Sequence, residues 1–198
     1  MKTEISVQLY ENIDDLLTKL AMKNAKFVEQ YQVIDYYFTK YSPIELKSKE
    51  YIEILDASFL VREIIEENSK SAKIVHKAKK LDEAGNVIAE DKTSVNIEDA
   101  KKAVALFKKS GLNCWCEMKN HSFVYSVDGI EFAIQEVEDL GTFIECEENN
   151  SIENLSDSEK FEFLKRFVYS LDFNIGNNFS VKKVYMKYLQ DNKNALSH

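Results

Sequence analysis

The chain has 198 residues, of which 44% are hydrophobic and 30% are charged. This composition is typical of folded globular proteins and excludes a disordered chain. The formal net charge of −8 argues against a nucleic acid or an anionic membrane surface as a partner, because both attract basic proteins. The length fits one large domain, so we expect residues 1–198 to form a single domain.

Targeting signals and cysteine content indicate the compartment. The N-terminal residues contain no long apolar region of the kind found in signal peptides, and no stretch approaches the length of a membrane span. Three cysteines, Cys114, Cys116 and Cys146, cannot all pair in disulfides. We therefore expect a cytoplasmic protein that is not associated with membranes.

The first half of the chain alternates between strand and helix patterns. Alternating polar and apolar residues predict a strand at residues 3–9, followed by an amphipathic helix capped by Asn12. An aromatic-rich strand is expected at residues 26–40. Ser42 and Glu45 have the spacing of a capping box, with Pro43 in the first turn, which predicts a helix to about residue 55. Further strands are expected at residues 59–66, 72–80 and 87–95, with a turn at residues 82–86.

The second half repeats this alternation. Asn96 is expected to cap an amphipathic helix that ends before Gly111. Strands are then expected at residues 113–118, 123–127, 130–137 and 142–147, with a hairpin turn at residues 126–129. Ser156 and Glu159 form a second capping box at the start of another helix. Residues 181–191 are expected to form the last helix.

These elements predict an α+β fold dominated by a sheet. Tyr (10 residues) and Phe (12 residues) are abundant, and aromatic side chains fit the half-buried surface of a sheet. About eight strands with polar residues on one face would close into an antiparallel eight-stranded β-barrel with flanking helices. Such a barrel is just wide enough to hold side chains and a small ligand.

Charged residues share strand faces in several places. Glu4 lies on the polar face of the first strand, Lys77 and Lys79 share a face, and so do Glu145 and Glu147. Carboxylates hold hard divalent cations, whereas Lys and Arg hold phosphate oxygens. As patterns, Glu145 and Glu147 also fit a strand face that is exposed to solvent. Lys77 and Lys79 also fit a sheet edge, where lysine discourages pairing with another strand.

Two further cations belong to the same set of candidates. Arg62 lies within an apolar run, where it either lines the lumen or forms a structural ion pair with a carboxylate. Lys92 lies in the strand that follows the turn at residues 82–86.

Several segments resemble the CYTH superfamily, the triphosphate tunnel metalloenzymes, and most closely its class IV adenylyl cyclase-like branch. Residues 129–147 match the late hairpin of the family, including Leu140-Gly141-Thr142-Phe143-Ile144-Glu145-Cys146-Glu147. Asp35-Tyr36-Tyr37-Phe38 resembles an Asp-x-Tyr-Phe strand, and residues 181–185 resemble the closing segment of the cyclase-like branch. The resemblance covers nearly the whole chain. The superfamily also includes thiamine triphosphatase-like proteins.

The resemblance implies a function and a set of site residues. It implies magnesium- or manganese-dependent binding and turnover of ATP or another triphosphate inside the barrel, by cyclisation or hydrolysis. Glu4, Glu145 and Glu147 would hold the metal. The phosphates would be held by Arg62, Lys77, Lys79, Lys92 and Lys119. Family members often pair through the barrel exterior, so the resemblance also allows for a homodimer.

Departures from the family pattern support a second reading. The N-terminal signature Glu-x-Glu-x-Lys is replaced by Glu4-Ile5-Ser6-Val7-Gln8, and other expected cations are missing. Each lost cation removes a charge-assisted bond to phosphate of roughly 1.5–3 kcal/mol. The barrel would then be a catalytically degenerate module that binds a phosphate ligand or a protein. A carrier barrel for an apolar ligand is the third reading, against which the polar strand faces argue.

Overall fold

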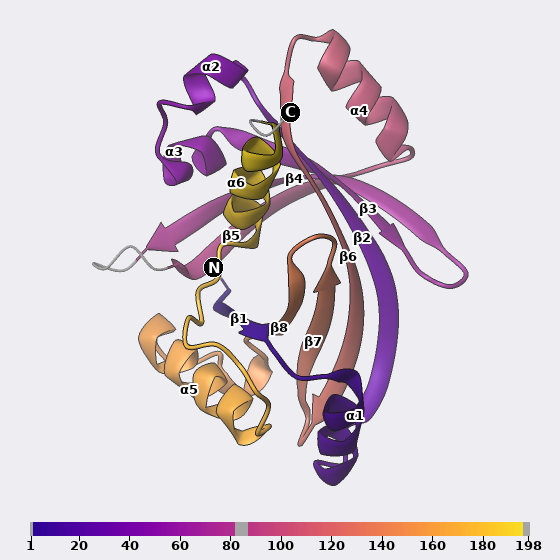
Figure 1. Cartoon of the computed structure of the whole chain (residues 1–198), viewed down its shortest axis with the longest axis vertical. Helices are drawn as coiled ribbons and strands as arrows, with labels where there is room; N and C mark the ends of the chain where they lie inside the picture. The colour runs from indigo at the N-terminus through magenta and orange to yellow at the C-terminus, as the bar shows by residue number, and fades with distance from the viewer. Residues whose placement is uncertain (1, 82–86, 196–198) are drawn as a thin grey trace.

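One curved antiparallel sheet dominates the fold. The computed structural model describes residues 2–81 and 87–195, and at residues 79–81, 87–90 and 193–195 it describes the backbone alone. The sheet has eight strands in the order β1-β8-β7-β6-β2-β3-β4-β5 (Figure 1). Their bounds are β1 (Glu4–Leu9), β2 (Lys26–Thr39), β3 (Ser58–Ile65), β4 (Lys70–Leu81), β5 (Val87–Ile97), β6 (Asn113–Val127), β7 (Ile130–Val137) and β8 (Gly141–Glu147).

Helices cover both surfaces of the sheet. They are α1 (Ile13–Met22), α2 (Pro43–Leu46), α3 (Tyr51–Asp56), α4 (Ala100–Lys109), α5 (Asp157–Ser170) and α6 (Lys183–Ala195). Apolar residues of α1 and α5 form one core with β1, β7 and β8, and those of α4 pack on β2 and β3. A third cluster joins α3 and α6 to the inner face of the sheet, where α6 lies in front of the strands in Figure 1.

Several local predictions are confirmed. Asn12 caps α1, and the capping boxes at Ser42 and at Ser156 are both formed. The hairpin turn between β6 and β7 contains Asp128 at φ 51° and Gly129 at φ 79°, the left-handed conformations that a tight hairpin requires. The turn expected at residues 82–86 lies outside the described residues.

Three predicted boundaries were wrong. The helix expected from Ser42 to about residue 55 is two short helices, α2 and α3, each with its own capping box. The cap of α4 is Asp99, whose side chain accepts a hydrogen bond from the backbone of Lys102, rather than Asn96, which lies in β5. The two strands expected at residues 113–118 and 123–127 form one strand, β6. Its polar centre pairs with β2 throughout, for example Asn120 with Val33, so the polar residues do not end the strand.

The prediction of a closed β-barrel was also wrong. The sheet is open, and among the described residues no backbone pairing joins β1 to β5, its two outer strands. The free edge of β1 is instead paired with the segment between α5 and α6. The Ser6 amide donates to the Phe179 carbonyl at 3.0 Å, and the Val181 amide donates to the Ser6 carbonyl at 3.1 Å. Because this segment satisfies the edge of β1, β5 cannot pair there.

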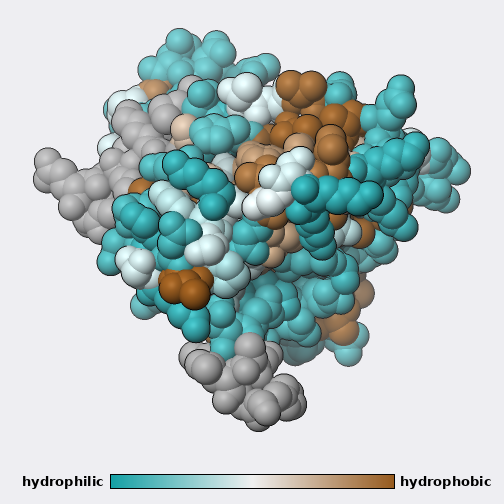
Figure 2. All heavy atoms as spheres, turned by 90° about the horizontal axis from the view of Figure 1, so that it is seen from above, coloured by the Kyte–Doolittle hydropathy of each residue, from teal (hydrophilic) through white to brown (hydrophobic). Residues whose placement is uncertain are grey.

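The face of the molecule seen in Figure 2 is predominantly hydrophilic, and its largest gathering of apolar side chains lies above the centre of the view. No helix within residues 2–81 and 87–195 is both long enough and apolar enough to cross a membrane.

We predict that Ser156→Ala lowers the free energy of unfolding by about 1 kcal/mol, because α5 would lose its N-cap hydrogen bond. Chemical denaturation measures this difference. Ser170→Ala is the matched control, since its hydroxyl at the other end of α5 only donates to the Phe167 carbonyl. Equal destabilisation by the two variants would contradict a specific role for the cap.

Candidate functional site

A cavity of about 410 Å³ lies on the inner face of the curved sheet. Strands place charged side chains in it because alternate residues of a strand project from the same face. The charged residues that line it include Glu4, Arg62, Lys73, Lys77, Lys92, Glu145, Glu147 and Lys183. The sheet therefore gathers acidic and basic groups that are far apart in the sequence into one space.

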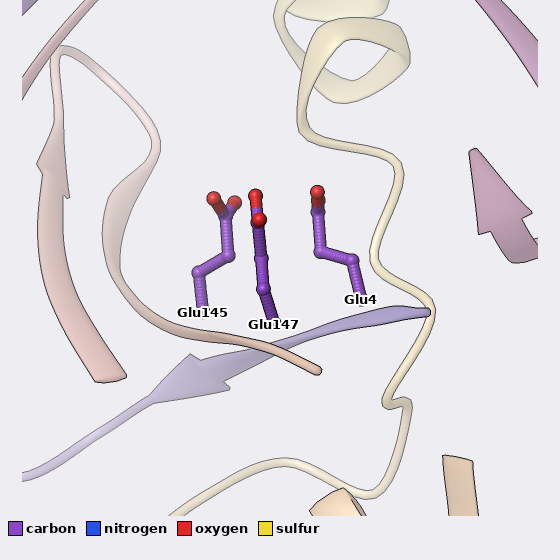
Figure 3. Close-up of side chains that lie close together, drawn as sticks. All are labelled: Glu4, Glu145 and Glu147. Carbon is purple, nitrogen blue, oxygen red and sulfur yellow. The ribbon is translucent and has the colours of Figure 1, made fainter. Parts of the chain in front are cut away.

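The acidic part of the cavity comes from the adjacent strands β1 and β8. Glu4 pairs with Glu147 in register, and Ser6 pairs with Glu145. One carboxylate oxygen of each of the three glutamates lies within 4.8 Å of the other two. Figure 3 shows the three side chains pointing to the same side of the two strands. The sequence-predicted metal ligands are thus brought together.

Lys92 crosses from β5 to this acidic group. Its ammonium lies 3.1 Å from Glu147 Oε1 and 3.4 Å from Glu4 Oε2. Burial opposes the charge of this lysine, but the attraction of the two glutamates outweighs it and raises the pKa of Lys92. Side chains therefore link the two outer strands that the backbone does not join.

Arg62 lies on β3 in the basic part of the cavity and is paired with Asp35 of β2. The guanidinium donates two hydrogen bonds, from Nε to Oδ1 at 2.7 Å and from Nη2 to Oδ2 at 2.6 Å. Asp35 is fully buried, whereas the side chain of Arg62 is 23% exposed. Both alternatives for Arg62 are therefore correct, because it lines the cavity and also forms a structural ion pair.

Two lysines of β4 extend this basic part. Burial, reinforced by repulsion from Arg62, lowers the pKa of Lys77 to about 8. Burial likewise lowers the pKa of Lys73, again with a contribution from Arg62. An anion in the cavity would relieve this repulsion, so the basic part is suited to a negatively charged ligand.

A further lysine, which the sequence did not single out, comes from α6. The ammonium of Lys183 donates to Gln135 Oε1 at 2.5 Å and forms an ion pair with Glu145. Its side chain is only 11% exposed. Lys183 is the third residue of the helix predicted at residues 181–191, and no helical pattern places it in a distant cavity, so periodicity gave no signal for this contact. Lys73 had one, since it shares a strand face with Lys77.

The acidic group fits a hard divalent cation. Adjacent oxygen ligands of Mg²⁺, at roughly 2.1 Å from the ion, are about 3 Å apart, so carboxylate oxygens that lie within 4.8 Å of one another would have to draw together around it. The Ser6 hydroxyl is buried in the same part of the cavity, at 6% exposure, and has no hydrogen-bond partner among the described residues. A buried hydroxyl without a partner is costly, and a bound ion or its water would satisfy it.

Two of the predicted phosphate ligands, Lys119 and Lys79, are not placed in the cavity by the structure. Lys119 projects from β6 to the face opposite to that of Met118 and Asn120, which line the cavity. Its ammonium lies 3.5 Å from Glu117 and 3.4 Å from Glu138. The side chain of Lys79 lies outside the described residues.

Comparisons with known proteins place the fold. No family model matches the chain, and no curated protein matches its sequence. A protein from Pyrococcus horikoshii OT3 has a similar structure, with a TM-score of 0.67 and 19% identity over 97% of this chain and 99% of the other.

Two similar structures carry functional descriptions. One is a proposed adenylyl cyclase from Hippeastrum with a dominant triphosphatase activity, with a TM-score of 0.58 and 18% identity over 92% of this chain and 93% of the other. The other is a proposed adenylate cyclase from Vibrio parahaemolyticus, with a TM-score of 0.55 and 14% identity over 84% and 88% of the two chains. The chain therefore has the fold of these adenylyl cyclase-like proteins, as the resemblance to the CYTH superfamily predicted.

Proposed function

We propose that the protein binds a triphosphate-bearing small molecule together with Mg²⁺ or Mn²⁺ in this cavity and cleaves its phosphate chain. The observation that carries the proposal is that one cavity holds both a group of three carboxylates and a group of cations. The first suits a divalent cation, and the second suits phosphate oxygens. The fold neighbours described as adenylyl cyclases, one with triphosphatase activity, support it.

Each group of the cavity has a defined role in this proposal. Glu4, Glu145 and Glu147 would hold the cation, which neutralises charge on phosphoryl oxygens and makes phosphorus more electrophilic when it is bound. Arg62 is held in place by Asp35 and presents its guanidinium edge to the cavity. Lys77 and Lys92 donate charge-assisted hydrogen bonds to the phosphate chain.

A second function is favoured by the lysine contacts. Lys92 and Lys183 between them already contact all three carboxylates. These lysines can neutralise the acidic group without a metal ion, which would make the protein a non-catalytic module that binds a phosphate ligand. The two functions differ in whether phosphate binding depends on a divalent cation.

The main test is thermal stability of the purified protein with ATP, thiamine triphosphate or inorganic triphosphate, each with and without Mg²⁺ or Mn²⁺. A ligand at about 100 times its Kd should add about 2.7 kcal/mol to the free energy of unfolding. We expect a metal-dependent increase that is lost in the Glu145→Gln/Glu147→Gln variant.

Glu131→Gln is the matched control, because this glutamate is exposed and does not line the cavity. Turnover is then assayed by product, since hydrolysis releases orthophosphate and cyclisation of a nucleoside triphosphate releases pyrophosphate. Binding that persists in EDTA without turnover would establish the second function. No stabilisation by any triphosphate would refute the first function.

The pKa of Lys77 predicts how affinity depends on pH. A bound phosphate stabilises the ammonium and raises this pKa above about 8, so above pH 8 binding takes up a proton. Affinity should therefore be steady between about pH 7 and pH 8 and fall above pH 8, by up to about ten-fold per pH unit. Isothermal calorimetry measures both the affinity and the proton uptake.

Lys77→Arg keeps its charge throughout this range and should flatten the profile. The second ionisation of a phosphate, with a pKa of about 6, is complete by pH 8 and does not contribute. An unchanged profile in Lys77→Arg would assign the pH dependence to another group.

Lys183→Met tests whether Lys183 competes with a cation for Glu145. We expect Mn²⁺ alone to bind about five-fold more tightly to this variant, because a partly buried ion pair contributes about 1 kcal/mol that the metal need no longer displace. Calorimetry with Mn²⁺ measures the change.

Lys187→Met is the control, since Lys187 also anchors α6 but does so through Asp139, away from Glu145; its other partner, Asp191, lies within α6. Unchanged or weaker Mn²⁺ binding in Lys183→Met would contradict the competition.

A further inference from the structure

The outer face of the sheet, opposite to the cavity, is exposed between the helices that pack on it. α4 and α1 lie toward opposite ends of β2 (Figure 1), and alternate residues of β2 follow the outer face between them. Phe38 packs against Phe107 of α4, with ring centroids 5.5 Å apart. Further along β2, at Ile34 and Gln32, the face is hollowed into a groove of about 340 Å³. The helix α4 is therefore a ridge that stands beside an open groove.

The groove carries net negative charge. Glu136 of β7 and Glu138, which directly follows this strand, both line it. Glu117 lies at its margin, where its carboxylate is 3.5 Å from the ammonium of Lys119. Lys119 also lies 3.4 Å from Glu138, so one lysine faces three carboxylates, and all four side chains are exposed. With His121, which also lines the groove, counted as neutral, the groove presents an excess of two negative charges to solvent.

The ridge carries the opposite charge. The ten residues of α4 include four lysines and no acidic residue, in a chain whose formal net charge is −8. The inner side of α4 packs on the sheet through Val104 and Phe107. The residues of its outer side are all exposed and are Lys101, Lys102, Ala105, Lys108 and Lys109. This helix therefore presents a basic surface directly beside the acidic groove.

A basic ridge beside an acidic groove is complementary to a second copy of itself. A two-fold axis between the two features would bring the ridge of each protomer onto the groove of its partner. Each helix–groove contact then forms twice, which doubles the buried area, and the assembly closes as a dimer. A contact of the same two surfaces without the two-fold axis would instead leave a free ridge and a free groove, and would continue into open chains.

We propose that this face is a homodimer interface in which α4 of each protomer lies in the groove of its partner. The lysines of α4 would meet Glu136 and Glu138, and opposite charges of this kind steer association and fix its orientation. Lys101 and Lys108 lie about 10.5 Å apart along one side of the helix, so both can contact the groove. The inference does not depend on the proposed function, because the cavity lies on the other face of the sheet.

Sedimentation velocity of the wild-type protein tests the dimer without any ligand. At low salt we expect the sedimentation coefficient to rise with protein concentration toward that of a dimer. Because salt screens charges between surfaces, raising NaCl from about 0.05 M to about 0.5 M should weaken dimerisation ten-fold or more. A monomer at every concentration at low salt would overturn the inference, and so would assembly that continues beyond the dimer.

A charge exchange locates the interface. Lys101→Glu/Lys108→Glu makes the ridge acidic, and Glu136→Lys/Glu138→Lys makes the groove basic. Each variant alone should dimerise at least ten-fold more weakly than the wild type, because like charges would meet. An equimolar mixture of the two should form a heterodimer. In that pair the acidic ridge of one variant meets the basic groove of the other, and the second contact keeps the wild-type charges.

Lys40→Glu/Lys47→Glu is the matched control, since it changes the net charge equally at two exposed lysines that flank α2. It should dimerise as the wild type does. Circular dichroism of each variant alone checks its fold before the mixture is made. Folded variants that dimerise like the wild type, or a mixture of them that stays monomeric, would overturn the assignment of this face.

Discussion

The buried pair of Asp35 and Arg62 is the constraint on which the inner face of the sheet depends. A fully buried carboxylate is costly unless it is paired and hydrogen-bonded, and here both of its oxygens accept from one guanidinium. The two residues face each other on β2 and β3, so the pair also fixes the guanidinium within the cavity. Removing either partner would leave an uncompensated charge, which costs about 3–5 kcal/mol at buried sites.

The charges around this pair follow from its position. Repulsion from Arg62 lowers the pKa of Lys77 and of Lys73, after the larger effect of burial. The acidic group of β1 and β8 is balanced by Lys92 and Lys183 instead. Under the proposed function, binding is thus an exchange of partners. Glu4, Glu145 and Glu147 would leave Lys92 and Lys183 to hold the metal ion, and these lysines would turn to the phosphates. Such an exchange favours a metal and a polyphosphate that arrive together.

How much the sequence predicted depends on whether the feature is local. The alternation of residues in a strand predicted that Glu145 and Glu147 share a face, and short-range spacing predicted the caps at Asn12, Ser42 and Ser156. Closure of the sheet could not be predicted in this way. It depends on the segment between α5 and α6, which has no periodic pattern yet occupies the edge of β1.

The site shows the same limit. The pairing of Arg62 with Asp35 requires the register of β2 against β3, and the contact of Lys183 with Glu145 requires the position of α6. Neither is encoded in a short window of sequence. The resemblance to a known family supplied Glu145 and Glu147, which lie in its best-matched segment, but it supplied neither of these two pairings.

The open edge of the sheet also connects the parts of the site. The segment that pairs with β1 is hydrogen-bonded to both the amide and the carbonyl of Ser6, through Phe179 and Val181. It then leads directly into α6. The strand that carries Glu4 is therefore hydrogen-bonded to the segment that runs into the helix carrying Lys183.

Lys183 at the start of α6 pairs with Glu145, and the segment before α6 pairs with the strand that carries Glu4. The open edge thus makes the C-terminal helix part of the acidic site, rather than only a cover above it.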